Sequence, residues 1–259
     1  MEFRRLHLSS ALLCFLAAAA LGSNQSGLPE TVKPVIDQAP IDAHSYDWMA
    51  RHNAVVDRVK QGHVDLLLIG DSITHMWGGV PEEQTIHGRG DYLWDKYFGS
   101  RNAVNLGFGW DRTQHVLWRF EHGEIDGIHP KVAVVMIGTN NMGTNSTDDI
   151  VTGIDTIVNQ LRHKLPRTKV LLLGIFPRDQ KPDTPNRKQI TEVNQRISAL
   201  GKKKGITYLD LTSSFLEPDG TISAEIMPDF LHPSSKGYGI WAKAMEPTLA
   251  KLFGDKPRE

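Results

Sequence analysis

Residues 64–72 read Val-Asp-Leu-Leu-Leu-Ile-Gly-Asp-Ser, an apolar run with one charge that ends in glycine and two polar side chains. Four further short apolar runs follow it, at 103–106, 132–137, 169–176 and 206–211. Helical patterns cover about 46–60, 148–165, 186–204 and 234–252. Near-continuous apolar strands alternating with helices are typical of a parallel sheet covered on both faces. The sequence therefore predicts one three-layer α/β/α domain with a central, mostly parallel sheet of about five strands.

The composition is that of an ordinary globular protein. The chain has 259 residues, of which 40% are hydrophobic and 23% charged, and its formal net charge is -1. This length is ample for one sizeable core. A charge so close to zero gives no electrostatic reason for binding nucleic acid or an anionic membrane, so we expect neither partner.

The N-terminus has the pattern of a secretory signal peptide. Arg4 and Arg5 precede an apolar stretch at about 11–21, and small residues follow at Ala20 and Gly22. A basic start, a short apolar middle and a small-residue end predict cleavage, here after residues 1–22. The stretch is short for a membrane span, although an uncleaved anchor is the alternative. We therefore expect a secreted or periplasmic protein without membrane insertion after signal removal.

The remaining chain divides into two parts. Residues 23–44 are polar and contain three prolines, which predicts a linker or an arm on the surface, and residues 45–254 form the domain. The single cysteine, Cys14, lies in the predicted signal. The mature chain would therefore have no disulfide and no cysteine-ligated metal.

Polar clusters follow three of the predicted strands directly. Ser72 follows the first, residues 107–111 the second, and Asn140 with Asn141 the third. Because ligands bind outside the carboxyl ends of parallel strands, these clusters should share one rim of the sheet.

A catalytic base is available in the loop before the last helix. Asp229 and His232 are three residues apart there, so one turn can bring carboxylate and imidazole together. A serine hydroxyl needs such an oriented base to become a nucleophile. The sequence therefore predicts Ser72 as nucleophile, His232 as base and Asp229 as its orienting partner.

Five short stretches of this sequence, taken together, resemble those of a known enzyme family. The chain is similar to GDSL-type esterases of the SGNH hydrolase superfamily, which have a flavodoxin-like fold. Within that superfamily it most resembles the platelet-activating-factor acetylhydrolase catalytic-subunit-like group. The resemblance spans about residues 45–252. It is carried by Gly-Asp-Ser-Ile-Thr at 70–74, the block at 105–113, His-Val-Leu-Trp-Arg at 115–119, Gly-Thr-Asn-Asn at 138–141 and Asp-Phe-Leu-His at 229–232.

The resemblance also implies an oxyanion hole. Its donors would be the backbone N–H of Ser72, the side-chain amide of Asn140 and the backbone N–H of the residue before Asp111. The family has glycine at that last position, whereas this chain has Trp110, with Gly109 one place earlier as the alternative donor. If the position needs positive φ, tryptophan would carry a strain of roughly 1–2 kcal/mol. We expect Trp110 to donate its N–H and its indole to wall the pocket.

Other classes of site find little support in the sequence. The histidines outside residues 1–22 show neither His-x-x-x-His nor His-Glu-x-x-His spacing, so we expect no metal. Gly107-x-Gly109 lacks the third glycine of a dinucleotide fingerprint, and we expect no cofactor. We interpret Asp71 as a residue that holds its loop. Arg112 and Arg178 are interpreted as residues of ion pairs or structural hydrogen bonds, with contact to substrate as the alternative.

The leading hypothesis is two-step hydrolysis of a short-chain ester through an acyl-enzyme. The resemblance implies acetyl as the acyl group, and export suggests acetylated carbohydrate as the substrate. A lysophospholipase or thioesterase of the same fold is one alternative. Another is a catalytically silent binding protein in which Trp110 blocks the pocket. The resembled group includes dimers, so a homodimer is an open alternative to a monomer.

Overall fold

The computed structural model describes residues 27–37, 46–82, 84 and 88–259. The predicted signal peptide at 1–22, with Cys14, lies outside the described residues, as do His44 and His87.

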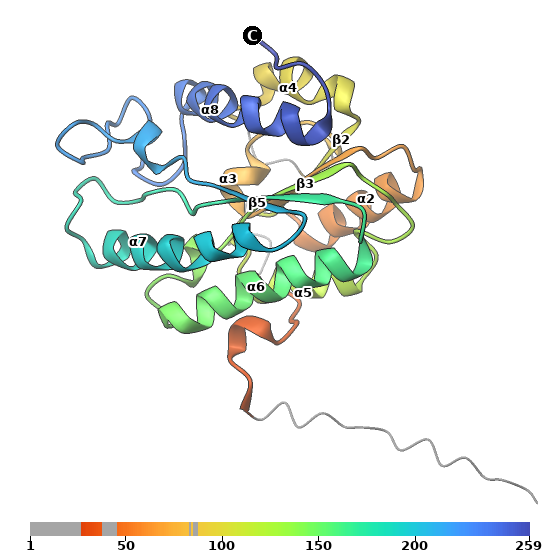
Figure 1. Cartoon of the computed structure of the whole chain (residues 1–259), viewed down its shortest axis with the longest axis horizontal. Coiled ribbons are helices and arrows are strands. Elements are labelled where there is room, and N and C mark those ends of the chain that lie inside the picture. Colours follow the sequence, from red (N-terminus) through yellow and green to blue (C-terminus); the bar gives the residue numbers. More distant parts are fainter. Residues whose placement is uncertain (1–26, 38–45, 83, 85–87) are drawn as a thin grey trace, which may run out of the picture.

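Five parallel strands form the centre of the domain (Figure 1). Their order is β2-β1-β3-β4-β5, and each pairs in parallel with its neighbours. The order is that of flavodoxin-like folds, in which the topological switch point lies between β1 and β3. The predicted three-layer fold with about five strands is thus confirmed. The strands are β1 (Leu66–Gly70), β2 (Ala103–Gly107), β3 (Val132–Met136), β4 (Lys169–Leu173) and β5 (Ile206–Leu209).

Helices cover both faces of this sheet (Figure 1). One face carries α2 (Trp48–Lys60), α5 (Thr113–Glu121), α6 (Thr147–Lys164) and α7 (Pro185–Ile197). The other face carries α3 (Ser72–His75), α4 (Asp91–Tyr97) and α8 (Ser235–Phe253). Alternate side chains of one strand serve the two cores: Leu67 and Ile69 of β1 join the first, whereas Leu66 and Leu68 join the second. Both faces are apolar, which explains the near-continuous apolar runs.

Several boundaries differ from the sequence expectation. The run at 169–176 leaves the sheet at Leu173, because the side-chain amide of Asn194 then bonds both the N–H and the carbonyl of Ile175, at 2.8 and 2.9 Å. The helix expected at 186–204 ends at Ile197 and continues as a 3-10 helix, Ser198–Lys202. The short helices α3, α4 and α5 were not predicted, because each has too few turns to show the helical spacing of apolar residues.

The described part of the predicted arm is docked on the domain. A single 3-10 turn, Glu30–Val32, places Thr31 in a buried position. Its hydroxyl donates to the carbonyl of Asp149 at 2.7 Å, and its carbonyl accepts from the hydroxyl of Thr113 at 2.9 Å. The arm therefore lies across the beginnings of α5 and α6.

The outer edge of β2 is closed at Asn105 and Gly107 by side chains and by Val80, which lies between α3 and α4. Arg51 of α2 donates to the carbonyls of Gly107 and Asn105, at 2.8 and 3.1 Å. The N–H of Asn105 donates to the carbonyl of Val80 at 2.7 Å, and that of Gly107 to the Asn105 side chain at 2.8 Å. Across the described part of the chain, no helix is long and apolar enough to cross a bilayer.

Candidate active site

Ser72 is positioned by the tight turn that ends β1. Gly70 permits the turn, since a Cβ there would lie 2.2 Å from the Thr74 hydroxyl and 2.4 Å from the Met136 carbonyl. Asp71 then caps α3, its carboxylate accepting the N–H of Ile73 at 3.0 Å, as expected of a loop-holding residue. Ser72 is the first residue of this helix and is 9% exposed. The fold thus places its hydroxyl at the carboxyl end of the sheet.

The predicted base and acid meet Ser72 in one line of hydrogen bonds. His232 Nε2 lies 2.8 Å from Ser72 Oγ, and its Nδ1 lies 2.9 Å from Asp229 Oδ2. The other carboxylate oxygen, Oδ1, accepts the backbone N–H groups of Leu231 at 3.1 Å and His232 at 2.7 Å. Phe230 completes this turn with a left-handed φ of 54°. The structure thus joins the three predicted residues, although Ser72 and His232 are 160 positions apart.

Asp229 is held in its ionised form. Partial burial raises the pKa of its carboxyl group, but hydrogen bonds from His232 and Leu231 outweigh burial and leave that pKa below its ordinary value. An anionic Asp229 accepts from Nδ1 of His232 and so leaves Nε2 able to take a proton from Ser72.

Arg89 also supports the loop of Asp229 and His232, a contact that was not predicted from the sequence. Its guanidinium lies 3.7 Å from Asp229 Oδ2 and donates to the carbonyl of His232 at 3.2 Å. Its backbone N–H donates to the carbonyl of Met76, directly after α3. Arg89 therefore connects the nucleophile segment to the acid-base loop. No local motif signals this contact, because the two partners are 143 positions apart.

The predicted oxyanion residues form a β-turn after β2. The N–H of Asp111 donates to the carbonyl of Phe108 at 3.2 Å, which makes Trp110 the third residue of the turn. Trp110 has φ of 68°, as the third position of a type II turn requires. Glycine usually takes this position, so tryptophan here carries the expected backbone strain. Its indole is 57% exposed.

The structure discriminates between the two backbone donors considered for this turn. The N–H of Gly109 donates to Nδ1 of the buried His75 at 3.2 Å, and it is therefore committed within the protein. That contact argues against Gly109 as the donor to an oxyanion.

Asn140 reaches this turn from the end of β3, which is separated from β2 by β1. It belongs to a 3-10 turn after β3, Thr139–Asn141, that begins at Gly138 with φ of 128°. Its Nδ2 donates to the backbone carbonyl of Asp111 at 2.9 Å. Asn141 has a different place: its Oδ1 accepts the N–H of Thr113 at 3.1 Å and ties the turn to α5.

A buried chain of charged groups lies behind the oxyanion turn. Trp48 Nε1 and Arg119 Nε each donate to a different carboxylate oxygen of Asp111, both at 2.8 Å. Arg119 also binds Glu124, which lies 2.8 Å from Nδ1 of His52. The side chains of Asp111, Arg119 and Glu124 are fully buried. No sequence motif predicts this cluster, in which Asp111 joins the turn to α2 and α5.

The other residues singled out in the sequence have supporting contacts. Arg178 donates to the carbonyl of Thr139 at 3.1 Å and so braces the turn that carries Asn140. The backbone N–H of Arg112 donates to Nδ1 of His115 at 3.1 Å. Among the described residues, Asp37, Asp111 and His115 offer atoms within 4.8 Å of one another. Asp111 already forms a buried ion pair with Arg119, so its charge is neutralised within the protein and attracts a cation less strongly.

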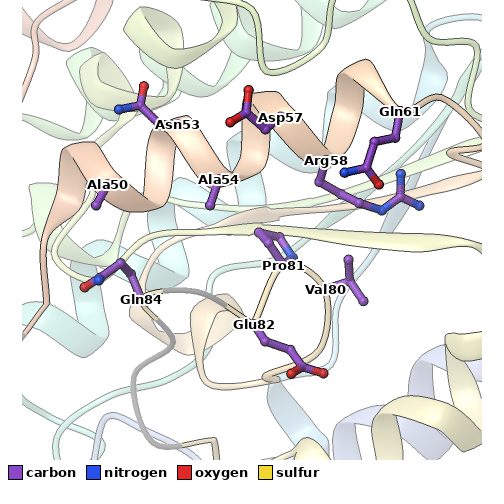
Figure 2. A pocket seen from close by; sticks show the side chains of 10 residues that line it. All are labelled: Ala50, Asn53, Ala54, Asp57, Arg58, Gln61, Val80, Pro81, Glu82 and Gln84. Atoms are coloured by element: carbon purple, nitrogen blue, oxygen red, sulfur yellow. The ribbon is translucent and has the colours of Figure 1, made fainter.

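A separate groove lies between α2 and residues 80–82 with Gln84 (Figure 2). Its volume is about 720 Å³, and polar side chains such as Asn53, Asp57 and Gln84 line it. Ser72 and His232 are not among the lining residues, so the groove is distinct from the ester site.

Comparisons with known proteins agree with this geometry. The sequence profile of the GDSL-like Lipase/Acylhydrolase family matches residues 68–240. The human platelet-activating factor acetylhydrolase IB subunit alpha2 is 35% identical over 213 residues, which cover 82% of this chain and 87% of that protein. The human alpha1 subunit is 36% identical over 207 residues, covering 80% of this chain and 84% of that protein.

Solved structures share the fold at lower identity. A putative acylhydrolase from Bacteroides fragilis superposes with a TM-score of 0.62 at 20% identity, covering 80% of this chain and 99% of that one. An acetylxylan esterase from Geobacillus stearothermophilus superposes with a TM-score of 0.58 at 19% identity, covering 75% and 96%. The profile match and the curated relatives, with the serine, histidine and aspartate joined at one rim, lead to one conclusion. The chain belongs to the GDSL-like lipase/acylhydrolase family and is a serine ester hydrolase.

Proposed function

We propose that this enzyme removes short acyl groups, acetyl above all, from esters through an acyl-enzyme on Ser72. The observation that carries the proposal is the unbroken hydrogen-bonded line from Ser72 through His232 to Asp229. Such a line activates a hydroxyl that is a poor nucleophile by itself.

In the proposed mechanism, Ser72 Oγ attacks the acyl carbonyl while His232 Nε2 takes the hydroxyl proton. The carbonyl oxygen becomes an oxyanion, which the N–H groups of Ser72, Trp110 and Asn140 stabilise. His232 then protonates the departing alcohol, and the acyl-enzyme forms. Water, activated by the same histidine, attacks the acyl carbon and releases the acid. Each oxyanion donor is worth about 2.7–4 kcal/mol in the transition state.

The nature of the ester is inferred from relatives and from Trp110. The human relatives are named acetylhydrolase subunits, and one structural neighbour is an acetylxylan esterase. The exposed indole of Trp110 sits on the turn that would bind the oxyanion, so it is open to contact with a substrate. A flat amphipathic ring in that place suits the apolar face of a sugar. These features support acetylated carbohydrate as the substrate.

We also propose that the enzyme works outside the cytoplasm, on the strength of the signal pattern at residues 1–22. Expression of the full chain in a bacterial host tests this location. The expected result is a product in the exported fraction whose mass lacks the first 22 or so residues. A full-length product retained in the cytoplasm would contradict it.

The central experiment is an ester chain-length series, measured with the wild type and Ser72→Ala. Ser213→Ala is the matched control, because Ser213 is an exposed serine on a separate 3-10 turn, Thr212–Phe215. The wild type and the control should hydrolyse acetyl esters fastest, and Ser72→Ala should fall to background. Acetate release from acetylated xylan then tests the carbohydrate substrate. If the wild type hydrolyses no ester faster than Ser72→Ala does, the enzyme proposal fails and a binding protein remains as the alternative. If the rate is highest with long acyl chains, a lysophospholipase is favoured.

A further inference from the structure

His75 lies on the nucleophile's own helix, three positions after Ser72, and is fully buried. Its Nε2 is 3.0 Å from the carbonyl of Gln84, and its Nδ1 is 3.2 Å from the N–H of Gly109. A carbonyl oxygen can only accept, so Nε2 carries the ring hydrogen. Nδ1 is then the acceptor for Gly109. The two contacts together determine the tautomer of the ring.

The surroundings of His75 favour a neutral ring. Burial, and to a lesser extent the positive charges of Arg51 and Arg119, hold the pKa of His75 well below its ordinary value, although the hydrogen bond to Gln84 acts in the opposite direction. The ring of Tyr46 packs edge-on against it at 4.9 Å between centroids. An imidazolium would place a hydrogen on Nδ1, facing the N–H of Gly109, and the contact would be lost.

The segments that His75 connects are also in close backbone contact. Asn105 Nδ2 donates to the carbonyls of Thr74 and Gly78, at 3.1 and 2.8 Å. A Cβ on Gly107 would lie 2.2 Å from the backbone nitrogen of His75, so only glycine permits this approach. The helix of Ser72 and the end of β2 therefore form one rigid unit, from which His75 reaches on to Gly109.

The position of Gly109 determines the direction of the Trp110 N–H. The hydroxyl of Tyr46 donates to the carbonyl of Gly109 at 3.0 Å, while His75 holds its N–H. The carbonyl of Gly109 and the N–H of Trp110 belong to the same planar peptide unit and point in opposite directions. Fixing Gly109 on both sides therefore fixes the line along which Trp110 can donate.

We propose that His75 is a positioning residue, which aligns the backbone N–H of Trp110 with the carbonyl attacked by Ser72. This inference rests on the proposed oxyanion role of Trp110. Ser72 and His75 lie on the same short helix, and His75 holds Gly109, whose peptide carries the Trp110 N–H. The nucleophile and the oxyanion donor therefore keep a constant separation. His75 itself touches neither the substrate nor the reacting atoms.

Two substitutions, each of which replaces one ring nitrogen of His75 by an amide group, test its two hydrogen bonds separately. In His75→Asn the amide oxygen takes the place of Nδ1 and keeps the acceptor for Gly109. In His75→Gln the amide nitrogen takes the place of Nε2 and keeps only the bond to Gln84. Each variant loses one hydrogen bond, so a purely structural role predicts similar melting temperatures and similar kinetics. The positioning role predicts that His75→Gln loses about tenfold or more in kcat at nearly constant KM, while His75→Asn stays within about threefold of the wild type.

Equal kcat losses in both variants, or a loss confined to KM, would overturn the inference. Ser72→Ala and Asn140→Ala are measured in the same assay. If they lose activity and His75→Gln does not, the positioning role fails while the proposed function stands. If Ser72→Ala is as active as the wild type, the proposed function itself fails.

A measurement on the unmodified enzyme covers the case in which the variants do not fold. The ¹⁵N chemical shifts of the His75 ring report its tautomer and charge directly. A neutral ring with its hydrogen on Nε2, and no titration across the pH range of activity, supports the inference. A charged ring, or a hydrogen on Nδ1, would rule it out, because neither form can accept from Gly109.

Discussion

Asn140 and Asp111 are joined by a 2.9 Å hydrogen bond from the side-chain amide of the first to the backbone carbonyl of the second. An asparagine amide has two hydrogens, so this bond uses one and leaves the other for the oxyanion. The bond crosses from the end of β3 to the end of β2. It therefore sets two proposed oxyanion donors, Asn140 and Trp110, at a constant separation.

Removing that amide should reduce turnover much more than binding. We expect Asn140→Ala to lower kcat by about 10²-fold to 10³-fold with little change in KM, since the donor acts mainly on the oxyanion of the transition state. Asn140→Asp keeps the shape but places a carboxylate beside the oxyanion, so its loss should be at least as large. Steady-state kinetics on an acetyl ester gives both values. A raised KM with unchanged kcat would show that Asn140 binds the ground state instead.

Trp110→Gly should separate the backbone role of this residue from that of its indole. Glycine relieves the positive φ of 68°, so we expect a free energy of unfolding that is unchanged or raised by about 1 kcal/mol. The N–H remains, and kcat on a small soluble acetyl ester should stay within severalfold of the wild type. Activity on acetylated polysaccharide should fall. Unchanged activity and substrate preference would refute the role of the indole as a wall.

Arg89 should contribute moderately to the acid-base loop. Its contact with Asp229 is partly exposed, and such ion pairs are worth no more than about 1 kcal/mol, which corresponds to about fivefold in rate. We expect Arg89→Gln to lower kcat by about that factor and Arg89→Lys to recover part of it. Arg58→Gln is the matched control, because Arg58 bonds the carbonyls of Gly62 and His63 beside a remote helix end. An equal loss in the control would point to general destabilisation.

Asp71 should make stability depend on pH. Burial raises the pKa of its carboxyl group to about 7, whereas an unfolded aspartate titrates near 3.9. Between these values the native state binds more protons, so this group lowers the free energy of unfolding as pH rises. From pH 5 to pH 8 the loss amounts to about 2–3 kcal/mol.

The Asp71→Asn variant isolates that contribution, since the amide oxygen can still accept the N–H of Ile73. Chemical denaturation should show it gaining stability over the wild type as pH rises from 5 to 8. Asp57→Asn, at a carboxylate that is 72% exposed, should show no such trend. A pH-independent difference between Asp71→Asn and the wild type would contradict the raised pKa.

Much of the fold could be predicted because its signals are local. Each strand is a short apolar run, and parallel strands bring the residues that follow them to one rim. Ser72 and Asn140 were placed by that rule alone. Asp229 and His232 were placed by their spacing in one loop. The catalytic roles assigned to these residues stay predictions that the variants above test.

The supporting contacts could not be predicted in the same way. Arg89 and His232 are 143 positions apart, and His75 and Gly109 are 34 apart, with no periodic pattern to connect them. The hydrogen bond from the Gly109 N–H to His75, which argues against Gly109 as an oxyanion donor, is likewise visible only in the tertiary structure. Buried ion pairs such as that of Asp111 with Arg119 cannot be recognised from composition, because a sequence does not distinguish a buried charged residue from an exposed one.

Arg51 has a consequence for self-association. A sheet edge whose outward N–H and carbonyl groups lack partners can recruit a strand from another molecule, which leads to sheet extension or aggregation. In β2 these groups on Asn105 and Gly107 are already bonded to Arg51, Val80 and the Asn105 side chain. At these two residues β2 therefore presents no unpaired N–H or carbonyl group to a strand from a second copy.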